Sequence, residues 1–374
     1  MKVTIPNLGN LASIAGKSLF YNLGHEVILP PPNTKRTLDL GIRYTPEYCC
    51  LPLKIVLGNF IEALEKGADT IIMVGGWGPC RFGYYAEIQR MILKSLGYKF
   101  KMIILEVPRG NLIRILRSVN LVRNKQSLSS LIKAGKIAWS KVVAIEDLEK
   151  EALTTRPREN LKGETSRILK RGLSLIDKAN SIGEIEKIKQ QIIKNFNEIK
   201  IKKDKELIRV KLVGEFYVAL EPFVNHNIEE KLGYLGVEVE RGVSVQPWIT
   251  SVFNLDFLKA GRQKEEDPIE KAARPYLPQS VGGEGQPTVG NIVLASEKGF
   301  DGAIQVVPFT CMPEIVAETV NKKVSEDLNF PVLTLIFDEQ TGEEGLNTRL
   351  EAFIDLLKSK KYNKHLTATK KYIS

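Results

Sequence analysis

The sequence is poor in the residues that build disulfide frameworks and histidine-rich metal sites. Its 374 residues include four cysteines and three histidines. The cysteines are Cys49, Cys50, Cys80 and Cys311. So few cysteines cannot form a dense disulfide framework, and the adjacent Cys49 and Cys50 are poorly suited to bridge each other. We therefore expect reduced thiols and a cytoplasmic location.

Long apolar runs and nucleotide-binding motifs are missing as well. No stretch of about 18 apolar residues predicts a membrane span, and the first residues enter a strand pattern without the features of a signal peptide. The formal net charge is +10, concentrated in Lys187–Lys205 and Lys358–Lys371, where a solvated helix face and a basic tail explain it. Without a P-loop, zinc-finger spacing or an aromatic RNA-binding signature, we expect neither nucleic acid nor a membrane as a partner.

Residues 1–110 alternate strand-like and helix-like segments. Strands are predicted at Val3–Pro6, Glu26–Leu29, Thr70–Val74 and Lys101–Glu106, and helices at Leu11–Leu23, Ile55–Lys66 and Tyr84–Leu96. The run Thr70–Val74 is continuously apolar, as in a strand buried on both faces. This alternation predicts an N-terminal α/β domain with a mostly parallel sheet.

The rest of the chain divides into three further segments. Residues 111–205 lack strand signals and predict a helical insertion or linker domain, with helices at Leu112–Asn124, Leu128–Ala134, Ile145–Leu153 and Arg167–Ile182 followed by an amphipathic stretch. Residues 206–358 return to the α/β pattern and end in a helix at Thr348–Lys358. Residues 359–374 form a basic tail. The two α/β domains look alike in design, although no close internal sequence repeat is evident.

Two of the cysteines occupy turns that lead from a strand to a helix. Cys80 follows the strand Thr70–Val74, and Cys311 follows the strand Ala303–Val307. Cys50 precedes the helix Ile55–Lys66. Because ligands of parallel α/β sheets gather at the carboxyl ends of strands, thiolates from two domains can converge in the cleft between them. Three thiolates suit an iron–sulfur cubane with one open iron.

Two plainer interpretations stay open. Cysteines are often small buried apolar residues with no ligand. A structural zinc ion would need a fourth protein ligand, and His25, His226 and His365 all lie away from the cysteine motifs.

Three segments resemble the 2-hydroxyacyl-CoA (2-hydroxyglutaryl-CoA) dehydratase component D family, in the branch related to CoA-enzyme activases. They are Cys50-Leu-Pro-Leu-Lys54, Asp301-Gly-Ala-Ile-Gln-Val-Val-Pro-Phe-Thr-Cys311-Met-Pro-Glu314, and the stretch from Asp338 to Phe353. The resemblance covers residues 1–110 and 208–357 well and the helical middle poorly. It implies two Rossmann-like or flavodoxin-like domains with a helical part between them.

The resemblance also implies a cofactor and partners. One [4Fe–4S] cluster would be held by Cys50, Cys80 and Cys311, with Cys49 as the alternative to Cys50. A separate ATP-dependent iron–sulfur activator would supply electrons, a homologous second subunit or a homodimer would complete the assembly, and an acyl-CoA or other small molecule would be the substrate. The chain would then be a dehydratase-like or reductase-like enzyme. A non-catalytic electron-transfer or scaffold subunit and a structural zinc-binding protein are the alternatives.

Further residues are weaker candidates. Lys54 lies one helical turn beyond Cys50 and can offset thiolate charge. Gly283 belongs to the Gly-rich segment Gly282–Gly290, expected as a flexible loop whose amides can close over an anion or the cluster sulfurs. Glu215, His226 and Glu339 are candidate catalytic groups at strand ends and turns, since carboxyl and imidazole groups transfer protons.

Overall fold

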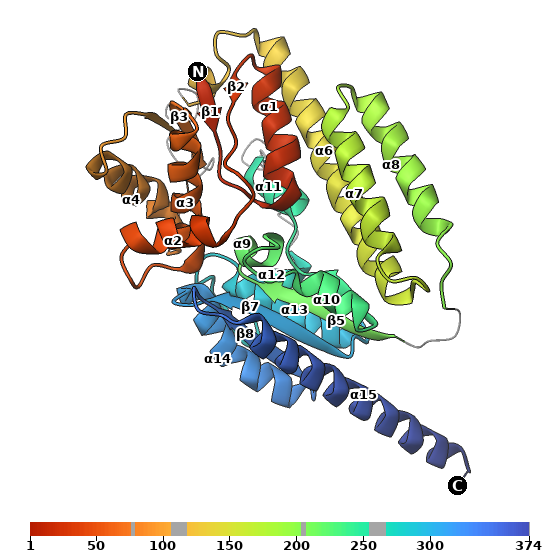
Figure 1. Cartoon of the computed structure of the whole chain (residues 1–374). Coiled ribbons are helices and arrows are strands. Elements are labelled where there is room, and N and C mark those ends of the chain that lie inside the picture. Colours follow the sequence, from red (N-terminus) through yellow and green to blue (C-terminus); the bar gives the residue numbers. More distant parts are fainter. Residues whose placement is uncertain (76–78, 106–117, 203–206, 254–266, 374) are drawn as a thin grey trace, which may run out of the picture. The chain divides into compact units, whose positions relative to one another are not determined.

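The computed structural model describes residues 1–75, 79–105, 118–202, 207–253 and 267–373. The chain forms two compact units, each assembled from separate stretches of sequence (Figure 1). Unit 1 comprises Met1–Glu149, Arg167–Asn197 and Ser244–Lys264, and unit 2 comprises Lys150–Ser166, Glu198–Val243 and Glu265–Ser374. No helix in the described ranges is long and apolar enough to cross a membrane.

Unit 1 contains a four-stranded parallel sheet in the order β2-β1-β3-β4. Its strands are β1 (Lys2–Thr4), β2 (Glu26–Val27), β3 (Thr70–Val74) and β4 (Lys101–Leu105). The helices that follow these strands are η1 (Leu11–Gly16), α1 (Lys17–Asn22), α2 (Lys35–Tyr44), α3 (Leu51–Glu65) and α4 (Phe82–Ser95). In α3 every residue from Leu51 to Leu64 is buried, including the polar Lys54, Asn59 and Glu62.

Three further helices run through the middle of the sequence. They are α6 (Leu128–Thr155), α7 (Glu164–Lys178) and α8 (Ile182–Asn197), and α11 (Val245–Phe253) joins unit 1 from farther along the chain. The start of α11 is held by Glu146 of α6, whose carboxylate accepts hydrogen bonds from the Val245 and Gln246 amides.

Unit 2 contains a second parallel sheet in the order β6-β5-β7-β8. Its strands are β5 (Ile208–Gly214), β6 (Val237–Arg241), β7 (Gly302–Pro308) and β8 (Val332–Phe337). Its helices are η2 (Arg156–Arg158), α9 (Phe216–Leu220), α10 (Ile228–Tyr234), α12 (Pro268–Ala273), α13 (Gly285–Glu297), α14 (Met312–Asp327) and α15 (Glu343–Ile373). Both sheets have the flavodoxin-like beginning, in which the second strand lies outside the first. The prediction of two parallel α/β sheets is confirmed.

Helices cover both faces of the unit 2 sheet. Ala303 of β7 packs in a core with α12, α13 and α14. Successive residues of a strand point to opposite faces, and the neighbouring Gly302 lies against Leu357 and Phe353 of α15. Alternate residues of β7 therefore pack against helices on opposite faces of the sheet. This packing explains why all seven residues of β7 are buried.

The two units repeat each other more closely than the sequence analysis recognised. When residues 57–74 are placed on residues 289–306, nine of the eighteen positions are identical: Gly58/Gly290, Asn59/Asn291, Ala63/Ala295, Glu65/Glu297, Lys66/Lys298, Gly67/Gly299, Asp69/Asp301, Ile72/Ile304 and Val74/Val306. The stretch covers the end of α3 or α13, the following turn, and β3 or β7. The expectation of no close internal repeat was wrong.

The repeat extends to individual contacts. Asp69 accepts the Lys2 amide of β1 at 3.0 Å, and Asp301 accepts the Arg209 amide of β5 at 2.8 Å. A Cβ at Gly58 would lie 2.0 Å from the Thr37 carbonyl oxygen of α2, and a Cβ at Gly290 would lie 2.1 Å from the Ile269 carbonyl oxygen of α12. Glycine in both units lets two helix backbones approach closely.

Several predicted boundaries change. Helix α3 begins at Leu51 instead of Ile55, because proline is compatible with the first helical turn. Residues 285–290, expected in a flexible loop, form the first turns of α13. The predicted helices 128–134 and 145–153 are parts of the single helix α6, and the expected tail continues α15 to Ile373. The predicted helix at 112–124 lies partly outside the described residues.

Candidate functional site

Cys50 lies at the N-terminus of α3, in unit 1. It is the N-cap residue, with an extended backbone (φ −66°, ψ 151°) and Pro52 in the first helical turn. A thiol at this position lies near the positive end of the helix dipole, which favours the thiolate.

The segment around Cys50 lies beside the segment that carries Cys80. The Cys50 sulfur and the Tyr85 hydroxyl are hydrogen-bond partners. Arg81 donates a hydrogen bond to the Tyr48 carbonyl oxygen at 3.0 Å. Tyr85 belongs to α4, which begins two residues after Cys80, so the two cysteine segments of unit 1 come together at one end of α3 and α4.

Cys49 shares this environment. Burial raises the pKa of the Cys49 thiol, while the positive charges of Arg81 and Lys54 lower it in part. Lys54, expected to offset thiolate charge, is only 2% exposed. Its charge acts on the cysteine segment from within α3.

Cys311 takes the same local structure in unit 2. It is the buried N-cap residue of α14 with an extended backbone (φ −73°, ψ 102°), and Pro313 follows in the first turn. A tight turn leads to it, because the Cys311 amide donates to the Pro308 carbonyl oxygen at 2.9 Å and Thr310 has a φ of 66°.

The cysteines do not form a complete metal site within either unit. None of the four is in a disulfide, and among the described residues no group of three or more His, Cys, Asp and Glu side chains has the arrangement of a metal site. Cys50 and Cys80 belong to unit 1, and Cys311 belongs to unit 2. The predicted cluster in a cleft between the domains stays a prediction.

Glu215 lies in a carboxylate group of unit 2 that the sequence analysis did not recognise as a whole. The other two members are Glu284, the N-cap of α13, and Glu314, in the first turn of α14. Glu314 is 0% exposed. Desolvation raises the pKa of Glu314 to about 8, and those of Glu215 and Glu284 to about 7. Glu215 and Glu284 are half-buried.

In the sequence, the three glutamates are marked only by their positions next to segments already singled out. Glu314 follows the Cys311 motif, and Glu284 stands inside the glycine-rich segment. Their proximity depends on the packing of α13 against α14, which spacing along the chain does not show.

The remaining candidates, His226, Glu339 and Gly283, lie in turns between elements of unit 2. His226 follows α9, not a strand, and stacks on Phe337 with ring centroids 6.3 Å apart. Burial lowers the pKa of His226, and Lys231 lowers it further. Glu339 lies in the turn between β8 and α15. Gly283 and its neighbour Gly282 both have positive φ, which explains the glycines at this turn.

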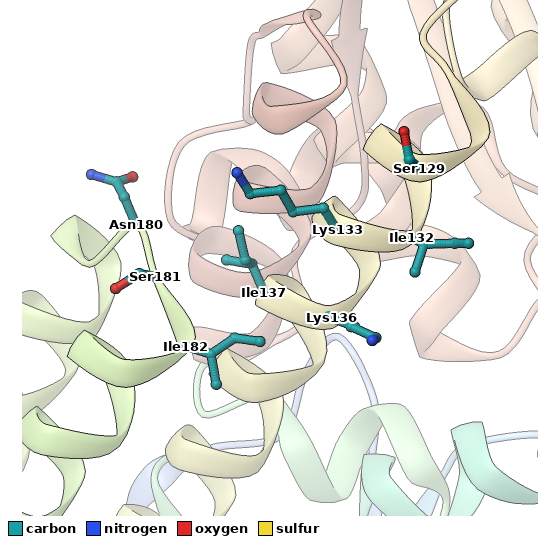
Figure 2. A pocket seen from close by; sticks show the side chains of 8 residues that line it. All are labelled: Ser129, Ile132, Lys133, Lys136, Ile137, Asn180, Ser181 and Ile182. Carbon is teal, nitrogen blue, oxygen red and sulfur yellow. The ribbon is translucent and has the colours of Figure 1, made fainter.

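A separate open groove of about 510 Å³ lies in unit 1 between α6 and the turn that joins α7 to α8 (Figure 2). Residues on its walls come from these two segments: Ser129, Ile132, Lys133, Lys136, Ile137, Asn180, Ser181 and Ile182. None of the predicted site residues lines it.

Comparison with known families gives one match. Residues 14–74 are similar to the family described as "CoA enzyme activase uncharacterised domain". The match includes Cys49, Cys50 and Lys54 and ends before Cys80. No curated protein matches the chain. The comparison therefore supports a relationship to CoA-enzyme activases, and it does not single out dehydratase component D.

Proposed function

We propose that the chain is an iron–sulfur protein related to CoA-enzyme activases. In this proposal Cys50, Cys80 and Cys311 hold one [4Fe–4S] cluster, and the iron without a cysteine ligand is open to a small substrate such as an acyl-CoA. The family match over residues 14–74 supports the relationship to CoA-enzyme activases. Three cysteine ligands leave one iron of a cubane without a protein ligand.

The observation that carries the proposal is the shared structure of Cys50 and Cys311. Each caps a helix from an extended backbone, and each is followed two positions later by proline. A thiolate at such a position is stabilised without a neighbouring base. Soft thiolates are the ligands that iron–sulfur clusters use, so the residues present fit the cofactor.

The surrounding residues have supporting roles. Arg81 and Lys54 bring positive charge to the Cys49–Cys50 segment, which offsets the negative charge of bound thiolates. The Tyr85 hydroxyl orients the Cys50 sulfur. When bound, the cluster supplies one-electron transfer and a Lewis-acidic iron. Because the sequence has no ATP-binding motif, a separate ATP-dependent activator would provide the electron.

The test is purification without oxygen, followed by iron, sulfide and zinc analysis of the wild-type chain and four single variants. Cys50→Ser, Cys80→Ser and Cys311→Ser should each lose the visible charge-transfer absorption. Cys49→Ser is the matched control and should keep it. A colourless protein with stoichiometric zinc favours a structural zinc site, and full iron content in Cys80→Ser or Cys311→Ser contradicts the ligand assignment.

A second measurement separates an enzyme from an electron-transfer subunit. Acyl-CoA added to the reduced protein should change its electron paramagnetic resonance spectrum if the open iron binds substrate. An unchanged spectrum with rapid electron acceptance from an activator favours the electron-transfer subunit.

A further inference from the structure

Three glutamates of unit 2 meet at the carboxyl edge of its sheet. Glu215 directly follows β5, and its amide donates to the Val306 carbonyl oxygen of β7 at 3.0 Å. Glu314 follows β7 by way of the Cys311 turn. Glu284 precedes Gly285, where a Cβ would lie only 2.6 Å from the Pro313 carbonyl oxygen. The backbone beside Glu284 therefore touches the backbone beside Glu314.

The Glu314 carboxyl group joins three elements. The Thr288 hydroxyl of α13 donates to both of its oxygens at 3.2 Å, and the Gln305 amide of β7 donates to Oε2 at 2.8 Å. Gln305 in turn accepts from Asn321 and Thr334, each at 3.1 Å. Glu314 thus fastens the start of α14 to α13 and to the sheet.

Nothing in the described part of unit 2 neutralises these carboxylates. The titratable groups that act on Glu314 are Glu284, from the start of α13, and Glu215, from the end of β5, while its partners Thr288 and Gln305 are neutral. Among the described residues no lysine or arginine pairs with any of the three, and no metal-site arrangement includes them. A buried charge without a partner is costly, so protons must remove it.

We infer that Glu314, Glu284 and Glu215 form a proton-linked switch on the turn that presents Cys311. With protons bound, the group holds α13 and α14 together. When the protons leave, three negative charges repel one another in the same small region, and the start of α14 loosens. The switch does not depend on a cluster being bound.

The sign of the pH effect follows from the raised pKa values. The ordinary value of 4.5 rises to about 7 for Glu215 and Glu284 and to about 8 for Glu314. Between these limits the folded chain binds more protons than the unfolded chain. The free energy of unfolding of unit 2 therefore falls as pH rises from about 4.5 to 8.

Two measurements on the full chain test the switch. Infrared spectroscopy should show the carbonyl stretch of a buried protonated carboxyl group at pH 7, and the band should vanish by pH 9. Hydrogen exchange, corrected for the intrinsic effect of pH, should show protection of residues 302–320 falling by about tenfold or more between pH 6 and pH 9, since one pKa unit is tenfold in an equilibrium.

Glu314→Gln should remove the part of the infrared band that persists near pH 8, leave the part that Glu215 and Glu284 contribute near pH 7, and weaken the pH dependence of exchange. Glu326→Gln, at an exposed position of the same helix, is the matched control and should change neither the band nor the exchange. If Glu314→Gln fails to fold, Glu284→Gln serves instead, because loss of one repelling charge should move the band's disappearance to lower pH. Absence of the band in the wild type at pH 7, or protection that does not change with pH, overturns the inference.

Discussion

The Tyr85 hydroxyl is hydrogen-bonded to the Cys50 sulfur across 35 residues of sequence. This contact joins the N-terminus of α3 to the first turn of α4. Phe82 packs edge-on against Tyr85, with ring centroids 5.4 Å apart. The Tyr85 side chain therefore links the two cysteine segments of unit 1.

Tyr85→Phe should destabilise the metal-free protein by about 1 kcal/mol, because it deletes one partly buried hydrogen bond and keeps the ring. Urea denaturation with reduced thiols measures the effect. Tyr84→Phe is the matched control, since Tyr84 is 72% exposed, and it should be neutral within about 0.5 kcal/mol. Equal effects of the two variants would show that the Tyr85–Cys50 bond contributes nothing.

Alanine at Gly58 or Gly290 should cost about 2 kcal/mol or more, because the new methyl group would overlap a helix carbonyl oxygen that only a backbone shift can move. Gly135→Ala in unit 1 and Gly345→Ala in unit 2 are controls, since a Cβ at either position meets nothing within 4 Å. Helical alanine should make them neutral or stabilising, by up to about 1 kcal/mol. If urea denaturation gave a control variant a lower free energy of unfolding than the test variant of the same unit, the close approach of the helices would be refuted.

Arg81→Gln should slow the alkylation of Cys49. The positive charge of Arg81 lowers the pKa of the Cys49 thiol, and burial raises it. Without Arg81 the pKa should therefore rise further, and less of the reactive thiolate should be present. In a background with serine at the other three cysteines, the rate with iodoacetamide near pH 8 should fall about two- to fivefold, and less at high salt. Arg90→Gln, farther along α4 in a pair with Glu87, should leave the rate unchanged. If Cys49 were alkylated at the same rate with Arg81→Gln as without it, Arg81 would have no electrostatic effect on the Cys49 thiol.

His226 should lower stability in acid. Burial lowers the pKa of its imidazole, so the folded state binds fewer protons than the unfolded state just below pH 6.5. The contribution of His226 to the free energy of unfolding should then fall as pH decreases through this range, opposite to the contribution of the three glutamates. The difference in free energy of unfolding between His226→Gln and the wild type, measured by urea denaturation, should change in favour of the variant from pH 7 to pH 5. A change in favour of the wild type would contradict the direction of the pKa shift.

The sequence predicted the elements whose signals are local. The continuous apolar run Thr70–Val74 is a central strand of the sheet, as expected. Cys80 and Cys311 come after the strands β3 and β7 in the chain, as their patterns indicated. The alternation of strands and helices was enough to predict two parallel α/β sheets, because a helix between two strands can carry the chain back across the sheet and make the strands parallel.

Features that depend on packing could not be predicted in the same way. Lys54 reads as a polar residue at a helix start, yet its neighbours bury it. Glu284 lies in a glycine-rich segment that reads as a loop, and its partner Glu314 lies 30 residues away in the sequence. The internal repeat is hard to recognise in the sequence because the identical residues are confined to the stretches around Gly58 and Gly290. The cysteines of the two units do not align with each other.

The iron and acid-labile sulfide content of the wild-type chain, purified without oxygen, tests most directly whether the chain holds a cluster. We expect about four iron atoms and about four sulfides per chain, as one cubane requires. A chain that carries no iron and no sulfide after reconstitution, while Cys50 and Cys311 remain reduced, would contradict this expectation.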